Sequence, residues 1–195
     1  MLTLDEMIQR TGKRANGFAM MVDHLRGREN PLIIETGCSR SENNFDGDGM
    51  STLIFDRYTR DHSGEFHSVD IDPGNIEFAK TKVSGNTNLH CYDSVAFLHN
   101  LNNVLVEENR KIDLLYLDSF DFYPEQELES SLHHIYEMLA IRPSLKSGTM
   151  IGVDDNIYNP QTGRYKGKGQ FVDQFMNLIG CTRVLEAYQF IWILP

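Results

Sequence analysis

The sequence predicts an α/β fold in which helices cover both faces of a doubly wound, mostly parallel β-sheet. Short apolar runs alternate with amphipathic segments along most of the 195 residues, and most runs end in an acidic residue just before a helix-start signal. Hydrophobic residues make up 41% of the chain and charged residues 24%, which is ordinary for a globular protein. We therefore expect a single domain over residues 1–195, with residues 1–30 as an N-terminal helical segment.

The N-terminal part of the chain shows the alternation clearly. Apolar residues at mixed three and four spacing predict one or two helices over residues 4–25. The apolar run at residues 31–35 predicts a buried strand that enters a turn at Gly37. A polar, glycine-bearing loop follows, and Ser51 and Thr52 then supply hydroxyls at the start of the next helix.

The same pattern continues to the C-terminus. The closing two strands are joined too tightly for a crossover helix, so they must be antiparallel. We expect the segment 156–170, with one proline and three glycines, to be a loop. The other expected strands lie at 66–72, 89–93, 112–118, 148–154, 182–186 and 188–194, and the other helices at 73–82, 94–106, 125–140 and 171–179.

Charge and cysteine content exclude several classes of function. The net charge of −10 disfavours a nucleic acid or an anionic membrane as partner. No stretch approaches the roughly 20 apolar residues that span a bilayer, and the N-terminus lacks a signal-peptide core. Cys38, Cys91 and Cys181 are far apart, which fits neither a disulfide framework nor a thiolate zinc site. We expect a cytoplasmic protein.

Acidic and polar residues gather where the expected strands end. In an open parallel sheet, ligands bind outside the carboxyl ends of the strands. Any one of these residues can be explained as a helix cap or turn residue. Five strand ends of the same character favour a ligand site. The residues are Glu35, Asp70, Asp72, Asp93, Ser94, Asp118, Asp154 and Asp155.

The loop after the first strand narrows the choice of cofactor. An acid such as Asp70, at the end of the second strand, accepts hydrogen bonds from a ribose diol, in NAD as readily as in S-adenosylmethionine (SAM). The loop ETGCSRSENNFDGDG has no G-x-G-x-x-G pattern, and the chain has no P-loop lysine motif. The polar loop suits a small sulfonium cofactor better than a pyrophosphate.

Over residues 32–194 the order of these features resembles the class I SAM-dependent methyltransferases. The resemblance implies a Rossmann-like seven-stranded sheet in the order 3-2-1-4-5-7-6 with strand seven antiparallel. Cys38 and Arg40 stand where many members carry further glycines. The implied cofactor contacts are Glu35, Gly37 and Ser39 around the methionine part of SAM, Asp70 on the ribose, and Asp93 and Ser94 beside the adenine.

The stretch from IDLLYLDSFDF to IGVDDN is similar to metal-dependent O-methyltransferases of the macrocin type, and to the cephalosporin hydroxylase, catechol and caffeoyl-CoA groups. This similarity implies that Asp118, Asp154 and Asp155 bind a divalent cation; a shifted register would use Asp155 with Asn156. Three converging carboxylates need a cation or a proton, and oxygen ligands suit Mg²⁺ or another hard cation.

The similarity also implies catalytic residues. A hydroxyl bound to the cation would have a lowered pKa and attack the SAM methyl in line. Asp118 is expected to take part as a ligand and Asp121 as a general base, because Asp121 stands where related enzymes carry a histidine in an Asp-x-x-His-x-Tyr run; Tyr123 matches the tyrosine. Alternatively, Asp121 caps the helix that begins near Pro124.

Two further groups of residues are open to two interpretations. Arg164, Lys166 and Lys168 form the main local basic cluster, which is either a mobile lid over an anionic ligand or a solvated glycine-rich loop. His133 and His134 lack the spacing of a metal site and are expected at the surface or the core edge.

The expected function is methylation of a hydroxyl on a small molecule, such as a sugar or a natural-product intermediate. The alternatives are a non-catalytic SAM-binding or scaffold protein and a modifying enzyme like the cephalosporin hydroxylases. Since only some thirty residues precede the first strand, the acceptor side is expected to be open or completed by a second subunit in a homodimer.

Overall fold

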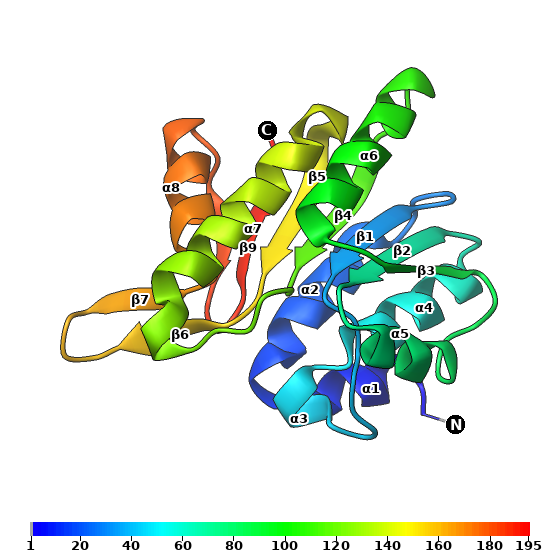
Figure 1. The fold of residues 1–195 in the computed structure, drawn as a ribbon, viewed down its shortest axis with the longest axis horizontal. Coiled ribbons are helices and arrows are strands. Elements are labelled where there is room, and N and C mark those ends of the chain that lie inside the picture. Colours follow the sequence, from blue (N-terminus) through cyan, green and yellow to red (C-terminus); the bar gives the residue numbers. More distant parts are fainter. Residues whose placement is uncertain (1) are drawn as a thin grey trace.

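A seven-stranded sheet lies between two layers of helices in the computed structural model, which describes residues 2–195 (Figure 1). The strand order is β3-β2-β1-β4-β5-β9-β8. The first five strands are parallel, whereas β9 runs antiparallel to both of its neighbours. This confirms the predicted order and the antiparallel seventh strand, because β8 and β9 are the sixth and seventh strands of this sheet along the chain.

The strands and helices lie close to their predicted positions. The sheet contains β1 (Leu32–Thr36), β2 (Glu65–Asp70), β3 (Thr87–Cys91), β4 (Ile112–Leu117), β5 (Leu145–Val153), β8 (Arg183–Glu186) and β9 (Phe190–Ile193). The α-helices are α1 (Leu4–Arg10), α2 (Ala15–Leu25), α3 (Phe45–Asp48), α4 (Ser51–Asp61), α5 (Pro73–Lys80), α6 (Ser94–Glu107), α7 (Glu127–Ile141) and α8 (Gln170–Leu178). Short 3₁₀ helices are η1 (Gly12–Arg14), η2 (Pro124–Gln126) and η3 (Arg142–Ser144).

Two hydrophobic cores hold the layers together, one on each face of the sheet. Successive residues of β4 show the division: Leu114 packs with α1, α2 and α4, whereas Leu115 packs with α6, α7 and α8. All six residues of β4 are buried, as expected for a central parallel strand covered on both faces. The sheet is therefore a rigid platform whose strand ends are fixed.

Two of the strand-end acids also cap helices. The Asp72 carboxylate accepts a hydrogen bond from the backbone N–H of Gly74 at 2.6 Å, at the start of α5. The Asp93 carboxylate accepts one from Ala96 at 2.8 Å, at the start of α6. The sequence left both the capping and the ligand interpretations open, and these two residues do act as caps.

The prediction that residues 156–170 form a loop is wrong in part, because this segment contains a β-hairpin. Strands β6 (Asn156–Asn159) and β7 (Arg164–Gly167) pair antiparallel and extend away from the main sheet (Figure 1). The rings of Tyr158 and Tyr165 lie opposite each other with centroids 5.2 Å apart. Pro160 and Gly163 lie in the turn, whereas Gly167 ends β7 and Gly169 precedes α8.

Within residues 2–195, none of the helices combines the length and the apolar character needed to cross a bilayer.

Candidate functional site

A cavity of about 480 Å³ lies at the carboxyl ends of the parallel strands, within the range of small-molecule sites. Its lining is rich in carboxylates and includes most of the strand-end residues singled out from the sequence. Predicted site residues on its wall are Gly37, Asp70, Asp93, Ser94, Asp118, Asp121 and Asp155. Further lining residues include Arg14, Cys38, Arg40, Asp48, Asp72, Ser119, Phe120, His133 and Tyr188.

Gly37 allows the turn after β1 to lie against the end of β4. Its φ is +80°, and a Cβ at this position would lie 2.4 Å from the backbone oxygen of Asp118. Its N–H donates to Val69 O at 2.8 Å, which ties the same turn to β2. A glycine is therefore required here both for backbone conformation and for space.

Asp70 organises the wall of the cavity at the end of β2. Its carboxylate accepts hydrogen bonds from the backbone N–H groups of Cys38 at 3.1 Å and Asp72 at 2.8 Å. Asn75 Nδ2 lies 3.2 Å from both carboxylate oxygens. The side chain thus joins the first loop to the start of α5 while it faces the cavity.

Glu35 and Ser39, predicted to contact the cofactor, lie behind the cavity wall rather than in it. Glu35 is fully buried, and its Oε2 accepts hydrogen bonds from Thr52 Oγ1 at 2.7 Å and Ser68 Oγ at 2.5 Å. Burial raises the pKa of Glu35 to about 7, against hydrogen bonds that lower it. The Ser39 N–H donates to Thr52 Oγ1 at 2.8 Å, so both residues anchor the first loop to α4.

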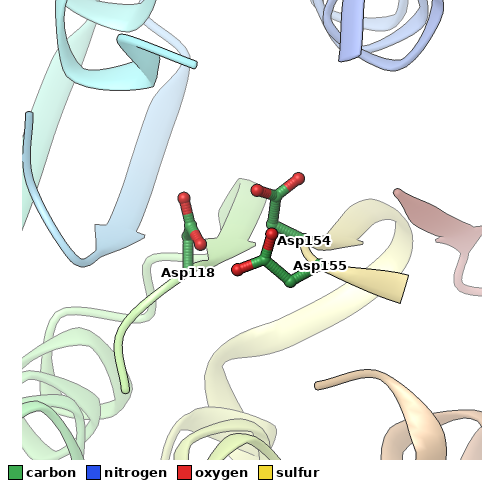
Figure 2. Close-up of side chains that lie close together, drawn as sticks. All are labelled: Asp118, Asp154 and Asp155. Carbon is green, nitrogen blue, oxygen red and sulfur yellow. The ribbon is translucent and has the colours of Figure 1, made fainter. Parts of the chain in front are cut away.

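The aspartates Asp118, Asp154 and Asp155 form a tight acidic cluster (Figure 2). One carboxylate oxygen from each lies within 4.8 Å of the others. Adjacent residues on a strand would point to opposite faces. Here β5 has already ended, and Asp155 adopts a left-handed backbone with φ 53°. Its side chain therefore points to the same side as that of Asp154, and its two carboxylate oxygens pair with Arg14 and Lys168.

Asn156 does not share in the cluster. Its Nδ2 donates to Val153 O at 2.9 Å and Asp154 O at 3.1 Å, and its Oδ1 accepts from the Gly169 N–H at 3.0 Å. Its side-chain amide is thus hydrogen-bonded to backbone groups. Of the two registers considered from the sequence, the structure therefore brings Asp154 and Asp155 to Asp118.

Two protein cations occupy the acidic cluster, and neither was predicted. Lys168 Nζ lies 2.7 Å from Asp118 Oδ1 and 2.9 Å from Asp155 Oδ2. Arg14, on η1, places Nε 2.7 Å from Asp154 Oδ2 and Nη2 3.3 Å from Asp155 Oδ1. The Tyr188 hydroxyl also donates to Asp155 Oδ1. Neither interpretation of the basic cluster fits Lys168, because its side chain is only 1% exposed.

Burial and these partners perturb the aspartates in opposite directions. Burial raises the pKa of Asp118 well above its usual range; Lys168 works against this shift, and the other two aspartates add to it. Burial also acts on Asp155, but Lys168 and the Tyr188 hydroxyl outweigh it and lower the pKa of Asp155 to about 2. Asp155 is thus ionised more readily than Asp118.

A divalent cation does not fit the cluster in this arrangement. A hard cation binds carboxylate oxygens at about 2.0–2.6 Å. The Lys168 ammonium already bridges Asp118 Oδ1 and Asp155 Oδ2, so an ion bound between these oxygens would need the space that Nζ fills. Asp154 Oδ1 is the buried cluster oxygen that has no hydrogen-bond partner among residues 2–195, but it belongs to a carboxylate that is already paired with Arg14.

Asp121 pairs with another residue of the cavity lining, Arg40. Arg40 Nη1 lies 2.8 Å from Asp121 Oδ2, and Arg40 Nε lies 3.1 Å from Asp48 Oδ1. The 3₁₀ turn that begins at Pro124 has no side-chain cap. The helix-cap alternative for Asp121 is therefore not what the structure contains.

His133 is a lining residue that the sequence interpretation placed at the surface or core edge. Its Nε2 lies 2.9 Å from Ser94 Oγ and 3.3 Å from Glu137 Oε1. Burial lowers the pKa of His133, but the buried Glu137 carboxylate outweighs it and raises the pKa. His134, next to it, is fully buried and bonds to Ser130 O at 2.7 Å. The i, i+4 spacing of His133 and Glu137 on α7 was the available signal.

The sheet order, the antiparallel last strand and the position of the cavity define the fold of the class I SAM-dependent methyltransferases. No family model matches the chain, and neither does any curated protein sequence. Solved structures do match in fold, at 11–15% identity for those described next.

The chain is similar to MycE, the methyltransferase of the mycinamycin biosynthetic pathway, in its complex with Mg, SAH and mycinamycin VI: TM-score 0.65, 11% identity, 98% of this chain and 53% of MycE. It is also similar to CalS11, a TDP-rhamnose 3'-O-methyltransferase of calicheamicin biosynthesis: TM-score 0.61, 15% identity, 91% and 77% coverage. DesVI of Streptomyces venezuelae matches at TM-score 0.55, 12% identity, 94% and 93% coverage. The chain spans about half the length of MycE.

Proposed function

We propose that this protein is a SAM-dependent methyltransferase that transfers a methyl group to a hydroxyl of a small molecule, such as a sugar or a natural-product intermediate. The observation that carries the proposal is the single cavity that joins Asp70 and Asp93 to Asp118 at the carboxyl ends of the strands. The fold supports it, because this edge of a doubly wound sheet is where such folds bind ligands. Similarity in fold to MycE, a methyltransferase, and to CalS11, a sugar O-methyltransferase, supports the same kind of transfer.

The first half of the sheet would hold the cofactor. In this proposal Asp70 accepts hydrogen bonds from the ribose, and Asp93 and Ser94 lie beside the adenine. Gly37 gives the methionine part close access to the backbone after β1. Glu35 and Ser39 lie behind the cavity wall and support it through hydrogen bonds with Thr52. The excess of carboxylates on the wall suits a cofactor that carries a positive sulfonium.

The second half would act on the acceptor. A hydroxyl placed beside Asp118 would give its proton to this carboxylate while its oxygen attacks the SAM methyl; the C–O bond forms as the C–S bond breaks and SAH leaves. Asp121 is the second candidate for the base, since it also lines the cavity. Lys168 and Arg14 neutralise the cluster from behind.

The oligomeric state and the cellular location are also proposals. We propose that a second copy of the chain in a homodimer completes the acceptor side of the cavity. Cys38, Cys91 and Cys181 are all free, which supports a reducing cytoplasm as the location.

Calorimetric titration of SAM and SAH into the purified protein tests the cofactor assignment. We expect saturable binding of both, and transfer of a radiolabelled methyl from SAM to at least one member of a panel of hydroxylated sugars and macrolides. Absence of any SAM or SAH binding would overturn the proposal. Binding without transfer to any acceptor would instead favour a non-catalytic SAM-binding protein, and oxidation of an acceptor would favour a modifying enzyme of the hydroxylase type.

A further inference from the structure

We propose that Lys168 is the resident cation of the Asp118–Asp154–Asp155 cluster, and that this site therefore works without a divalent metal. The inference concerns the site of the proposed function and departs from the Mg²⁺ that the sequence resemblance implies. It assigns Lys168 as a positioning residue that holds Asp118 and Asp155 in place beside the acceptor side of the cavity.

The contacts of the Lys168 ammonium match those of a bridging cation. An ammonium group has three N–H donors. Nζ lies 2.7 Å from Asp118 Oδ1, 2.9 Å from Asp155 Oδ2 and 3.4 Å from the backbone oxygen of Asp118. Three oxygens from two strand ends thus converge on one buried nitrogen. A metal ion could use the same oxygens only if the ammonium left.

Charge balance leads to the same conclusion. Even with all three carboxylates ionised, the cluster carries three negative charges, and Arg14 and Lys168 supply two positive charges within ion-pair distance. A divalent ion would turn a cluster with one excess negative charge into one with an excess positive charge. It would also lie close to two buried cations, where repulsion is only weakly screened. Both Arg14 and Lys168 are at least 96% buried.

The backbone on both sides of Lys168 is fixed, so the ammonium is held in the cluster rather than carried on a mobile lid. The Gly167 carbonyl accepts a hydrogen bond from Ser131 Oγ at 2.7 Å, and the Gly169 N–H donates to Asn156 Oδ1 at 3.0 Å. Gly167 has φ +131°, and a Cβ there would lie 1.9 Å from Asp155 O. Gly167 therefore lets the end of β7 lie directly against Asp155.

The hairpin therefore has a specific task in the site. Its first strand begins just after Asp155 and its second strand ends just before Lys168, so the register Asn156↔Gly167 sets the spacing of carboxylate and ammonium. A fixed ammonium can orient the Asp118 carboxylate toward an acceptor hydroxyl. It cannot bind that hydroxyl as a ligand in the way a metal ion would, so deprotonation falls to Asp118 itself.

Titration of the wild-type protein with Mn²⁺, followed by the electron paramagnetic resonance signal of free Mn²⁺, tests the inference directly. We expect no binding at the cluster up to about millimolar Mn²⁺. Lys168→Met frees Asp118 and Asp155, and we expect at least a tenfold gain in Mn²⁺ affinity. Lys166→Met is the matched control, because Lys166 lies on β7 two residues before Lys168, is 51% exposed and pairs with Glu127 outside the cluster. This variant should bind Mn²⁺ no better than the wild type.

The wild-type titration decides the matter even if Lys168→Met fails to fold. Tight Mn²⁺ binding by the wild type that is lost in Asp118→Asn and in Asp155→Asn would overturn the inference. A folded Lys168→Met with unchanged Mn²⁺ affinity would also overturn it, and circular dichroism establishes folding. The double variant Lys168→Met/Asp118→Asn removes one charge of each sign and should not gain affinity. None of these measurements uses SAM, so their outcome is distinguishable from failure of the proposed methyl transfer.

Discussion

Arg40 Nη1 lies 2.8 Å from Asp121 Oδ2 and so joins the loop after β1 to the loop after β4 beside the cavity. Arg40 stands where many of the methyltransferases that the sequence resembles have a glycine, and Asp121 stands where related ones often have a histidine. The two departures from these patterns are thus partners of each other. This pairing separates Asp121, bound to an exposed arginine, from Asp118, bound to a buried lysine.

Asp118→Asn should lower the rate of methyl transfer by about 10²–10⁴, because this amide cannot accept the acceptor proton. Asp121→Asn should lower it by less than about tenfold, because Asp121 is 38% exposed and its charge is already paired with Arg40. Single-turnover rates at saturating SAM compare the two variants. The reverse ranking would make Asp121 the base, and equal SAH affinity in both variants serves as the control.

Asp70→Ala should weaken SAH binding by about 10- to 100-fold, since it removes charge-assisted hydrogen bonds worth roughly 1.5–3 kcal/mol. It also releases the Cys38 N–H and thus the first loop. Asp121→Ala is the matched control, because Asp121 lines the same cavity, and it should change the affinity by less than about threefold. Isothermal titration calorimetry with SAH measures both; equal losses would refute the assigned roles.

Arg14→Met should lower the free energy of unfolding by about 3–5 kcal/mol, because it leaves the carboxylate of Asp154 buried without its cation. Arg26→Met removes a surface pair with Asp23 whose side chains are 69% and 62% exposed. That control should change stability by no more than about 0.5 kcal/mol. Urea denaturation at neutral pH measures both. A loss below about 1 kcal/mol in Arg14→Met would show that water already screens the cluster.

Glu35→Gln should remove a pH dependence of stability. Burial raises the pKa of Glu35 from 4.5 to about 7 in the folded protein. Between these values the folded chain keeps a proton that the unfolded chain releases, so the free energy of unfolding of the wild type falls as pH rises from 4.5 to 7. The size of this component is on the order of 3 kcal/mol.

The measurement is urea denaturation of both proteins at several pH values from about 5 to about 8. The amide introduced by Glu35→Gln resembles the protonated acid and does not titrate, so the difference between variant and wild type should grow with pH. Parallel curves for the two proteins would contradict a raised pKa. Glu6→Gln is a matched control at an exposed helix start, where the pKa is lowered rather than raised.

Much of the fold followed from local patterns in the sequence. The apolar runs that became β1 and β4 are buried along their whole length, and periodicity alone identifies such strands when turn and helix signals bound them. The hairpin β6–β7 was missed because Pro160 and Gly163 in its turn are also what a loop contains. Cross-strand pairing depends on two segments together, so the sequence of either segment alone does not reveal it.

The carboxylates of the site were also accessible from the sequence, for a physical reason. Asp70, Asp93 and Asp118 each follow a parallel strand, and parallel strands end at the same edge of the sheet. Their convergence therefore follows from the order of elements. Glu35 differs because it lies inside β1, one residue before the end of the strand, and its buried carboxylate accepts hydrogen bonds from Thr52 and Ser68 behind the cavity wall.

Local sequence patterns were sufficient to predict the layered fold, the edge of the sheet that holds the site and the acidic residues gathered there. The groups that neutralise these acids depend on long-range packing. Arg14 lies about a hundred residues before Asp118 in the chain and Lys168 fifty residues after it, and no local pattern links a 3₁₀ turn and a hairpin end to one strand edge. Partners of a buried charge are set by long-range packing, so the cation of this cluster became visible only in the folded chain.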